Sequence, residues 1–223
     1  MKTTRLIVML LYTLGVNAQG TAPVSVSVMN MESKPYVHDK ILFVGEKSKK
    51  IYSGTTDQRG TFLVQLPDND TYTIKIDVIG DAMEYNTLEI PALPTGASFQ
   101  QMELSIQYEL PSYYTLSDLR FETGKSTIRT DSYEIMDQLV DFMRRKGNTR
   151  IVIVGHTDNI GDASSNLILS RQRADSVRAY LIRNKVDASR IKTEGRGSRE
   201  PVADNSTESG RAQNRRTEVR IVE

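Results

Sequence analysis

The spacing of apolar residues changes once along this chain of 223 residues, and the change limits the folds open to it. From residue 22 to about 108, β-branched and aromatic residues recur with a period of two in short runs, which is typical of strands. After residue 130 the apolar residues recur with the period of an amphipathic helix. A typical domain has roughly 100–150 residues, so we expect an all-β module followed by a mixed α/β module.

The first half predicts a small β-sandwich at residues 22–108. Turn-forming Asp, Gly, Pro and Asn residues separate its apolar runs, as expected for short strands joined by tight connections. The runs that we interpret as strands are 24–28, 40–45, 61–66 and 72–80. Prolines at 91, 94 and 111 follow, and we place a linker at residues 109–115.

The second half, residues 116–223, predicts the order β-α-β-α-β-β. The first helix has Thr130 or Asp131 as its N-cap and ends at Gly147, and the second carries apolar residues on one face. Expected strands are 117–121, 150–155, 190–195 and 217–222, and the second helix spans 166–185 with Leu167, Ala174, Val177 and Leu181 on its apolar face. Packing both helices on one side of the sheet gives a two-layer α/β domain, so the chain as a whole is predicted to be α+β.

Charge and cysteine content exclude several classes. The formal net charge is +1, which gives no global attraction to nucleic acid. Residues 19–110 hold 7 basic and 12 acidic residues, whereas residues 111–223 hold 20 basic and 16 acidic, in keeping with two modules of different roles. Without cysteine, and with only two histidines, the chain offers no disulfide and no recognisable metal site, and we expect no cofactor.

The first 18 residues are predicted to be a secretory signal peptide. Lys2 and Arg5 precede an apolar run at residues 6–16, and Ala18 is the small residue that signal peptidase requires. The run is shorter than the roughly 20 residues that cross a bilayer. We therefore expect a mature, exported chain without a transmembrane segment.

One polar segment, "GHTDNIGDASSNLILSRQRA" at residues 155–174, joins a buried strand to a helix. Asp158 lies just past the strand, where a ligand also meets the free N–H groups and positive dipole of a helix start. Arg173 follows 15 residues later and can turn back toward that loop. A carboxylate beside a guanidinium suits a zwitterionic ligand. Two alternatives stay open: Asp158 satisfies loop N–H groups only, or Arg173 merely pairs with Asp158.

This segment resembles the OmpA-like peptidoglycan-binding domain. The resemblance is carried by "GHTDNIG" at 155–161, "NLILSRQRA" at 166–174 and "NRR" at 214–216, and it extends over about 100 residues. In that family the matching aspartate takes the ammonium of meso-diaminopimelate in the peptide stem, and the matching arginine takes its carboxylate. The resemblance therefore assigns those roles to Asp158 and Arg173.

Other residues receive lesser roles, most of them from their own chemistry and position. Asn166 is an N-cap, a loop brace or a ligand contact, Thr157 is a supporting hydroxyl, and Thr123 and Gly124 would offer backbone N–H groups to a ligand. Gly124 stands where some relatives carry an aspartate that touches the stem. His156 is expected to pack beside the sheet, and Arg215 and Arg216 to support the site or to form charge pairs beneath it.

Residues 54–74, "GTTDQRGTFLVQLPDNDTYTI", resemble the carboxypeptidase-regulatory-like (transthyretin-like) β-sandwich. Such modules are spacers or contact surfaces, and the resemblance implies no chemistry.

The sequence thus favours a non-catalytic peptidoglycan-binding protein of the Gram-negative periplasm, held near the outer membrane by partners. The alternative is a structural subunit of an envelope assembly in which residues 22–108 make the main protein contact. A wall hydrolase is disfavoured, because no cysteine nucleophile exists and neither histidine has a recognisable Ser-Asp or ligand set.

Overall fold

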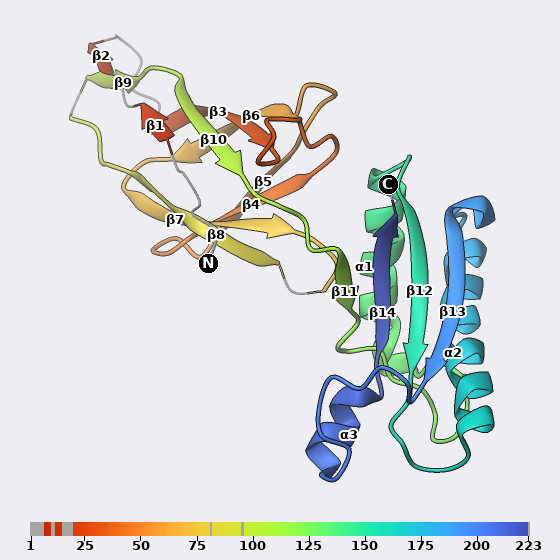
Figure 1. Cartoon of the computed structure of the whole chain (residues 1–223). Coiled ribbons are helices and arrows are strands. Elements are labelled where there is room, and N and C mark those ends of the chain that lie inside the picture. The colour runs from red at the N-terminus through yellow and green to blue at the C-terminus, as the bar shows by residue number, and fades with distance from the viewer. Residues whose placement is uncertain (1–6, 10–11, 15–19, 81, 95, 223) are drawn as a thin grey trace. The chain divides into compact units, whose positions relative to one another are not determined.

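The computed structural model describes residues 7–9, 12–14, 20–80, 82–94 and 96–222. Within them the chain is a mixed α/β protein with three α-helices and several sheets (Figure 1). It divides into two compact units, Met1–Leu110 and Pro111–Glu223. The predicted signal peptide falls mostly outside the described residues and stays a prediction.

The first unit is made of strands. Two four-stranded sheets have the orders β1-β10-β3-β6 and β5-β4-β7-β8, and β2 pairs with β9. The strands are β1 (Ile7–Met9), β2 (Tyr12–Leu14), β3 (Thr21–Met29), β4 (Lys40–Gly45), β5 (Ile51–Thr55), β6 (Thr61–Pro67), β7 (Asp70–Asp77), β8 (Met83–Ile90), β9 (Ala97–Phe99) and β10 (Met102–Gln107).

Each of these sheets buries one face. In β3 every second residue is buried, and β4, β7 and β10 show the same alternation. The rings of Phe43 on β4 and Phe62 on β6 meet edge to face with centroids 6.5 Å apart, so side chains of the two sheets share a core. Gly54 of β5 makes room for Phe62, because a Cβ there would lie 2.0 Å from the ring. The four runs predicted as strands are confirmed, in β4 with the predicted bounds and in β3, β6 and β7 with shifted ends.

The second unit holds a four-stranded sheet in the order β11-β14-β12-β13, with α1 and α2 on one face (Figure 1). Strands β12 and β13 are parallel, and β14 runs antiparallel to β12 and β11. The elements are β11 (Tyr113–Thr115), η1 (Thr130–Ser132), α1 (Tyr133–Arg145), β12 (Arg150–His156), α2 (Ala163–Arg183), η2 (Ala188–Arg190), β13 (Ile191–Gly197), α3 (Glu208–Asn214) and β14 (Thr217–Val222).

Helix α2 approaches the sheet closely because two strand positions are glycine. A Cβ on Gly155 of β12 would lie 2.1 Å from the carbonyl oxygen of Ser170, and one on Gly195 of β13 would lie 2.7 Å from the backbone nitrogen of Arg171. Atoms cannot approach so closely, and neither neighbour is a flexible side-chain end. The two glycines therefore fix the distance between α2 and the strands, and with it the position of Arg173.

Three predictions for this unit were wrong, and one helix was missed. The first strand is β11 at 113–115, inside the predicted linker, whereas Phe121 makes only an isolated bridge to Ile128. The N-cap of α1 is Ser132, because a turn of 3-10 helix occupies Thr130–Ser132. Helix α2 begins three residues early, and α3 was not foreseen.

On the apolar face of α2, Ala174, Val177 and Leu181 are buried as predicted, whereas Leu167 is only half-buried.

Candidate functional site

The loop after β12 is built by two side chains that hold its backbone. Asp162 is the N-cap of α2, and its Oδ2 accepts the backbone N–H of Ser165 at 2.8 Å. Asn166, one turn into the helix, donates from Nδ2 to the carbonyl oxygen of Ile160 at 2.9 Å. Of the roles open to Asn166, the structure shows the loop brace, while the capping role belongs to Asp162.

Asp158 lies in this loop and has a partner on each oxygen. Its Oδ1 accepts the backbone N–H of Ile160 at 3.1 Å, and its Oδ2 accepts Nη1 of Arg215 at 2.7 Å. The second terminal nitrogen of Arg215 donates to Oε1 of Glu208 at 2.7 Å. We call Asp158, Glu208 and Arg215 the rim cluster. The hydrogen bonds to Asp158 and Glu208 raise the pKa of Arg215.

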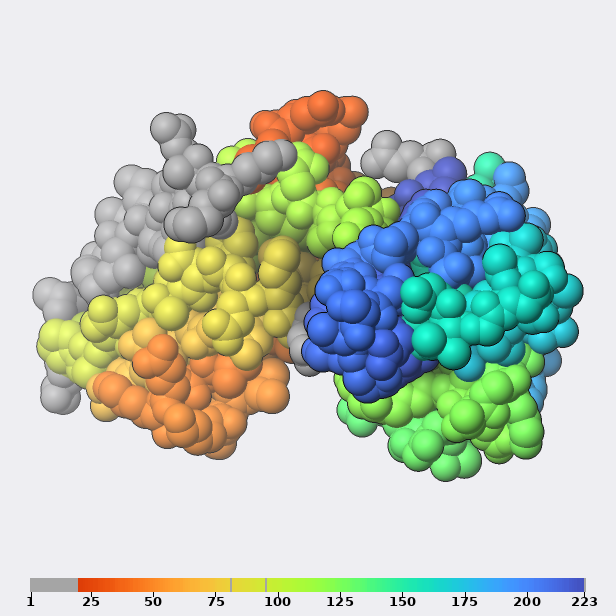
Figure 2. All heavy atoms as spheres, turned by 60° about the horizontal axis from the view of Figure 1, so that its bottom comes forward, coloured from red at the N-terminus to blue at the C-terminus, as the bar shows by residue number. Residues whose placement is uncertain are grey.

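The rim cluster joins two segments of the unit, the loop between β12 and α2 and the region of α3. Arg215 directly follows α3, and Asp158 belongs to the loop between β12 and α2. Figure 2 shows the blue surface around α3 next to the teal surface of that loop, which the ion pair between Arg215 and Asp158 joins. The side chain of Asp158 is 13% exposed and that of Arg215 is 38% exposed, so both contact solvent.

Arg173 is positioned by the loop at residues 121–128. Its Nε donates to the carbonyl oxygen of Lys125 at 3.1 Å, and its guanidinium carbon lies 5.1 Å from the ring centroid of Phe121. Among the described residues its two terminal nitrogens donate no hydrogen bond. Burial lowers the pKa of Arg173, and the charge of Asp158 opposes this shift. The two side chains thus feel each other's charge without forming an ion pair.

One alternative from the sequence is therefore wrong: Arg173 does not pair with Asp158, because Arg215 takes that place. The other alternative holds in part, since Asp158 does accept one loop N–H from Ile160. A carboxylate offers about four lone-pair positions. Asp158 therefore retains acceptor capacity beyond its two hydrogen bonds.

Thr123 and Gly124 lie on the exposed tip of the 121–128 loop. Gly124 has a φ of 69°, a conformation that favours glycine, and a Cβ there would meet nothing within 4 Å. The next residue, Lys125, connects the tip to the rest of the site, because its backbone carbonyl oxygen accepts a hydrogen bond from Arg173.

His156, Thr157 and Arg216 lie beneath the loop. Thr157 is buried and donates from Oγ1 to the carbonyl oxygen of Asp158 at 2.9 Å, which fixes the backbone there. His156 is buried, and its Nε2 lies 3.6 Å from Oε1 of Glu218. Arg216 bonds the same oxygen from Nε at 2.8 Å, and Arg220 donates to Oε2 from Nη2 at 2.9 Å. We call His156, Arg216, Glu218 and Arg220 the sheet cluster.

Sequence reasoning missed three contributors to the site. Phe121 and the carbonyl of Lys125 position Arg173, and Glu208 holds Arg215. The Arg215–Asp158 pair joins residues 57 apart in the chain, so no local pattern announces it. The only signal was the double arginine at 215–216, which the sequence could not divide between two roles.

No described helix is long and apolar enough to cross a membrane. No group of three or more His, Cys, Asp or Glu side chains among the described residues has the arrangement of a metal site.

Several known proteins match about half of this chain. Outer membrane protein A of Bordetella avium is 42% identical over 106 residues, which cover 48% of this chain and 55% of that protein. Peptidoglycan-binding protein ArfA of Mycobacterium tuberculosis is 43% identical over 96 residues, which cover 43% of this chain and 29% of that protein. A crystal structure of the peptidoglycan-associated lipoprotein from Burkholderia pseudomallei is 26% identical and covers 47% of this chain and 88% of that chain, with a TM-score of 0.44.

The chain thus spans about half the length of the first curated relative and less than a third of the second. The profile of the OmpA family matches residues 120–215, which include α1, α2, α3, the loop at 121–128 and the rim cluster. Residues 120–215 therefore form an OmpA family domain.

Proposed function

We propose that this protein is a non-catalytic, peptidoglycan-binding protein of the cell envelope, and that its OmpA family domain binds the diaminopimelate of the peptide stem. The observation that carries the proposal is the presence in one site of two unpaired binding groups. Asp158 keeps acceptor capacity, and the terminal nitrogens of Arg173, which feels the charge of Asp158, donate to no described residue. One relative is called a peptidoglycan-binding protein, which supports the choice of ligand.

The charges of the site suit a zwitterion. The ligand ammonium approaches Asp158, and the ligand carboxylate approaches the terminal nitrogens of Arg173. Arg173 needs no rearrangement for this, because the Phe121 ring and the Lys125 carbonyl already hold its guanidinium. In this proposal the N–H groups of Thr123 and Gly124 add contacts to the same carboxylate. Pre-organisation of this kind reduces the entropy lost on binding.

Arg215 has a second role in the proposal. It neutralises part of the charge of Asp158 and orients the carboxylate, while Glu208 anchors Arg215 from the other side. The ligand ammonium then shares Asp158 with Arg215. His156, Thr157 and Arg216 support this arrangement from below.

The first unit is proposed to act as a spacer or as a contact surface for another envelope protein, in keeping with the resemblance of residues 54–74. Ile51 on β5 and Leu63 on β6 are large apolar side chains exposed on neighbouring strands, which is consistent with a protein contact. We place the protein in the periplasm of a Gram-negative bacterium, associated with the outer membrane through partners.

The test is binding of the purified protein to synthetic stem peptides and to isolated Gram-negative sacculi. Loss of one charged hydrogen bond costs about 1.5–3 kcal/mol, so Asp158→Ala and Arg173→Ala should each weaken binding roughly ten- to a hundred-fold. A stem peptide with lysine in place of diaminopimelate lacks the carboxylate that Arg173 binds. Wild type should therefore prefer diaminopimelate, and Arg173→Ala should lose the preference.

Two matched controls are available. Arg171 lies on the far side of α2 from Arg173 and pairs with Asp175 at 3.3 Å, so Arg171→Ala removes an arginine from the same helix outside the site. Asp141 on α1 pairs with Arg145, and Asp141→Ala is the counterpart for Asp158. Wild type that stays in solution with sacculi, or controls that lose as much binding as the site variants, would contradict the proposal.

A further inference from the structure

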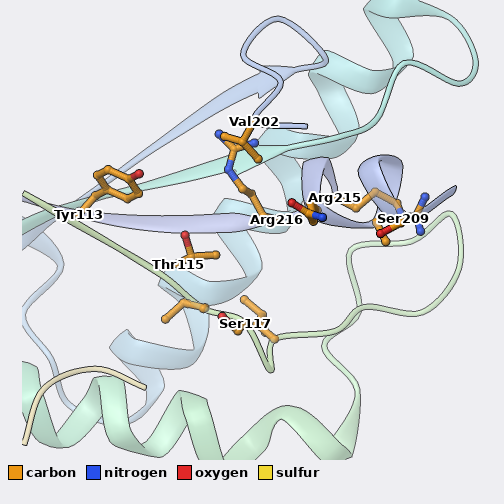
Figure 3. Close-up of a pocket in the computed structure, with 11 residues that line it drawn as sticks. Tyr113, Thr115, Ser117, Val202, Ser209, Arg215 and Arg216 are labelled. Atoms are coloured by element: carbon orange, nitrogen blue, oxygen red, sulfur yellow. The ribbon is translucent and has the colours of Figure 1, made fainter. Parts of the chain in front are cut away.

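A pocket lies beside the rim cluster, and Arg215 forms part of its wall. It has a volume of about 560 Å³, within the roughly 300–1,000 Å³ of small-ligand sites. Figure 3 shows Tyr113, Thr115 and Ser117 along one side, Ser209 and Arg215 on another and Val202 above Arg216. The hollow is lined by Tyr113, Thr115, Leu116, Ser117, Leu119, Val202, Ser209, Ala212, Gln213, Arg215 and Arg216.

The walls of this pocket carry uncommitted neutral polar groups. Among the described residues, no hydrogen bond engages the hydroxyls of Thr115, Ser117 and Ser209 or the side-chain amide of Gln213. Such groups both donate and accept hydrogen bonds. They face a floor that includes the buried Leu116. The pocket therefore combines apolar surface with neutral hydrogen-bonding groups that a ligand can satisfy.

The two arginines in the wall of the pocket are already paired with carboxylates, so they attract a charged ligand only weakly. Arg216 is bonded to Glu218 and to the carbonyl oxygen of Glu200, and its side chain is 9% exposed. Both terminal nitrogens of Arg215 are taken by Asp158 and Glu208. A charged ligand would find no unpaired counter-charge in this pocket. The chemistry fits an uncharged ligand with many hydroxyl groups.

Tyr113 supplies a flat apolar surface at the mouth. Its side chain belongs to an edge strand, and the residue is 48% exposed, while Val202 opposite is 58% exposed. An exposed tyrosine ring presents an apolar body and a polar tip. The C–H face of a sugar ring packs on such a ring while its hydroxyls reach the neighbouring Ser and Thr groups.

We propose that this pocket is a saccharide subsite that takes a sugar ring of the wall's glycan chain. The inference rests on the proposed function, because Arg215 lines the pocket and also bonds Asp158 of the stem-binding site. A polymer that carries a peptide stem on a sugar would occupy both places at once. The two contacts then act as one bivalent attachment, which strengthens binding without any change in the stem site.

The experiment compares three probes: a stem peptide with diaminopimelate, a disaccharide that carries the same stem, and the disaccharide alone. Wild type should bind the disaccharide-stem about tenfold more tightly than the stem peptide, the effect expected of one aromatic contact with a few hydrogen bonds. Tyr113→Ala should remove this gain and leave the affinity for the stem peptide unchanged. Tyr113→Phe, which keeps the ring, should retain most of the gain.

Tyr133→Ala is the matched control, because Tyr133 is similarly exposed on α1 and does not line the pocket. Asp158→Ala should weaken both stem-bearing probes and leave the ratio between them intact, so the stem site and the sugar site fail separately. If the stem peptide does not bind but the disaccharide alone shifts the NMR signals of Ser209 and Tyr113, the result supports the sugar site and contradicts the stem site. Equal affinity for both stem-bearing probes, or equal losses in Tyr113→Ala, would overturn the sugar site.

Discussion

Arg215 and Arg216 are neighbours in the chain and belong to two different charge clusters. Arg215 lies in the rim cluster, where its side chain is 38% exposed and its partners are Asp158 and Glu208. Arg216 lies in the sheet cluster, where its side chain is 9% exposed and its partner Glu218 is 5% exposed. The two guanidinium groups make ion pairs of equal length, 2.7 Å, in very different surroundings.

Burial decides what each pair can do. Burial alone raises the pKa of Glu218, but hydrogen bonds from Arg220 and Arg216 outweigh it and hold this pKa below its usual range. Breaking such a pair strands a charge away from water and is costly. An ion pair open to solvent contributes only about 0–1 kcal/mol. The ion pairs of the rim cluster therefore break at a lower cost than those of the sheet cluster, which hold the buried charge of Glu218.

The largest effect should come from breaking the sheet cluster. Arg216→Ala leaves Glu218 buried with only Arg220 and His156 beside it, and removal of one partner from a buried pair costs about 3–5 kcal/mol. We expect the free energy of unfolding of the second unit to fall by about 3 kcal/mol, since Arg220 compensates in part. Hydrogen exchange of the β12 and β14 amides measures this loss. Unchanged protection would mean that the cluster is not structural.

The next effect is a dependence on pH that belongs to the sheet cluster. Burial, followed by the charge of Arg216, lowers the pKa of His156 below 6.5. The unfolded chain then takes up a proton first as the pH falls, so the stability present above pH 6.5 declines as the pH drops toward the folded pKa. Exchange rates of β12 amides at pH 7.5 and pH 5.5, for wild type and His156→Leu, measure this.

A pH above 5 keeps the carboxyl of Glu218 ionised, because its pKa lies below 4.5. The change in stability between the two pH values should be smaller in His156→Leu. An equal change in both proteins would show that His156 does not titrate in this range.

The smallest effect on stability should come from Arg215→Ala. The side chains of Arg215 and Glu208 are 38% and 68% exposed, and Asp158, which is 13% exposed, keeps the N–H of Ile160 as a donor. The free energy of unfolding should therefore change by only about 1 kcal/mol. Affinity for a diaminopimelate stem peptide should nevertheless fall by up to about tenfold, because Asp158 loses the donor that orients it. Calorimetric titration measures the affinity. Glu208→Gln should change both quantities less, because Asp158 keeps Arg215 as its donor. A loss of stability as large as that of Arg216→Ala would abolish the distinction between the clusters.

The helices and strands could be predicted from the sequence where burial of one face gives the apolar residues a regular spacing. The strand at 40–45 and most of α2 follow their apolar patterns, since each buries one face. Helix α3 was missed because it has seven residues and buries only Gly210 and Asn214, so it carries no apolar period. Strand β11 was misplaced because only Tyr114 of its three residues is buried.

The candidate site likewise has residues that the sequence could indicate and a contact that it could not. Asp158 and Arg173 could be singled out because a dense polar segment follows an apolar strand, and their place in one local motif follows from the chain alone. Their proposed roles in binding await the tests above. The partner of Asp158 could not be found that way, because Arg215 reaches it from 57 residues away through the turn between α3 and β14.

The sequence by itself determined the change from β to mixed α/β structure, the order of most elements and the segment that carries the site, because these depend on local periodicity and turn chemistry. Only the tertiary structure decided which arginine pairs with Asp158, which ring positions Arg173 and which of two adjacent arginines is buried. Those outcomes depend on distances between segments far apart in the chain. They are fixed by the packing of α2 on Gly155 and Gly195 and by the pairing of β14 with β12, neither of which has a local signal.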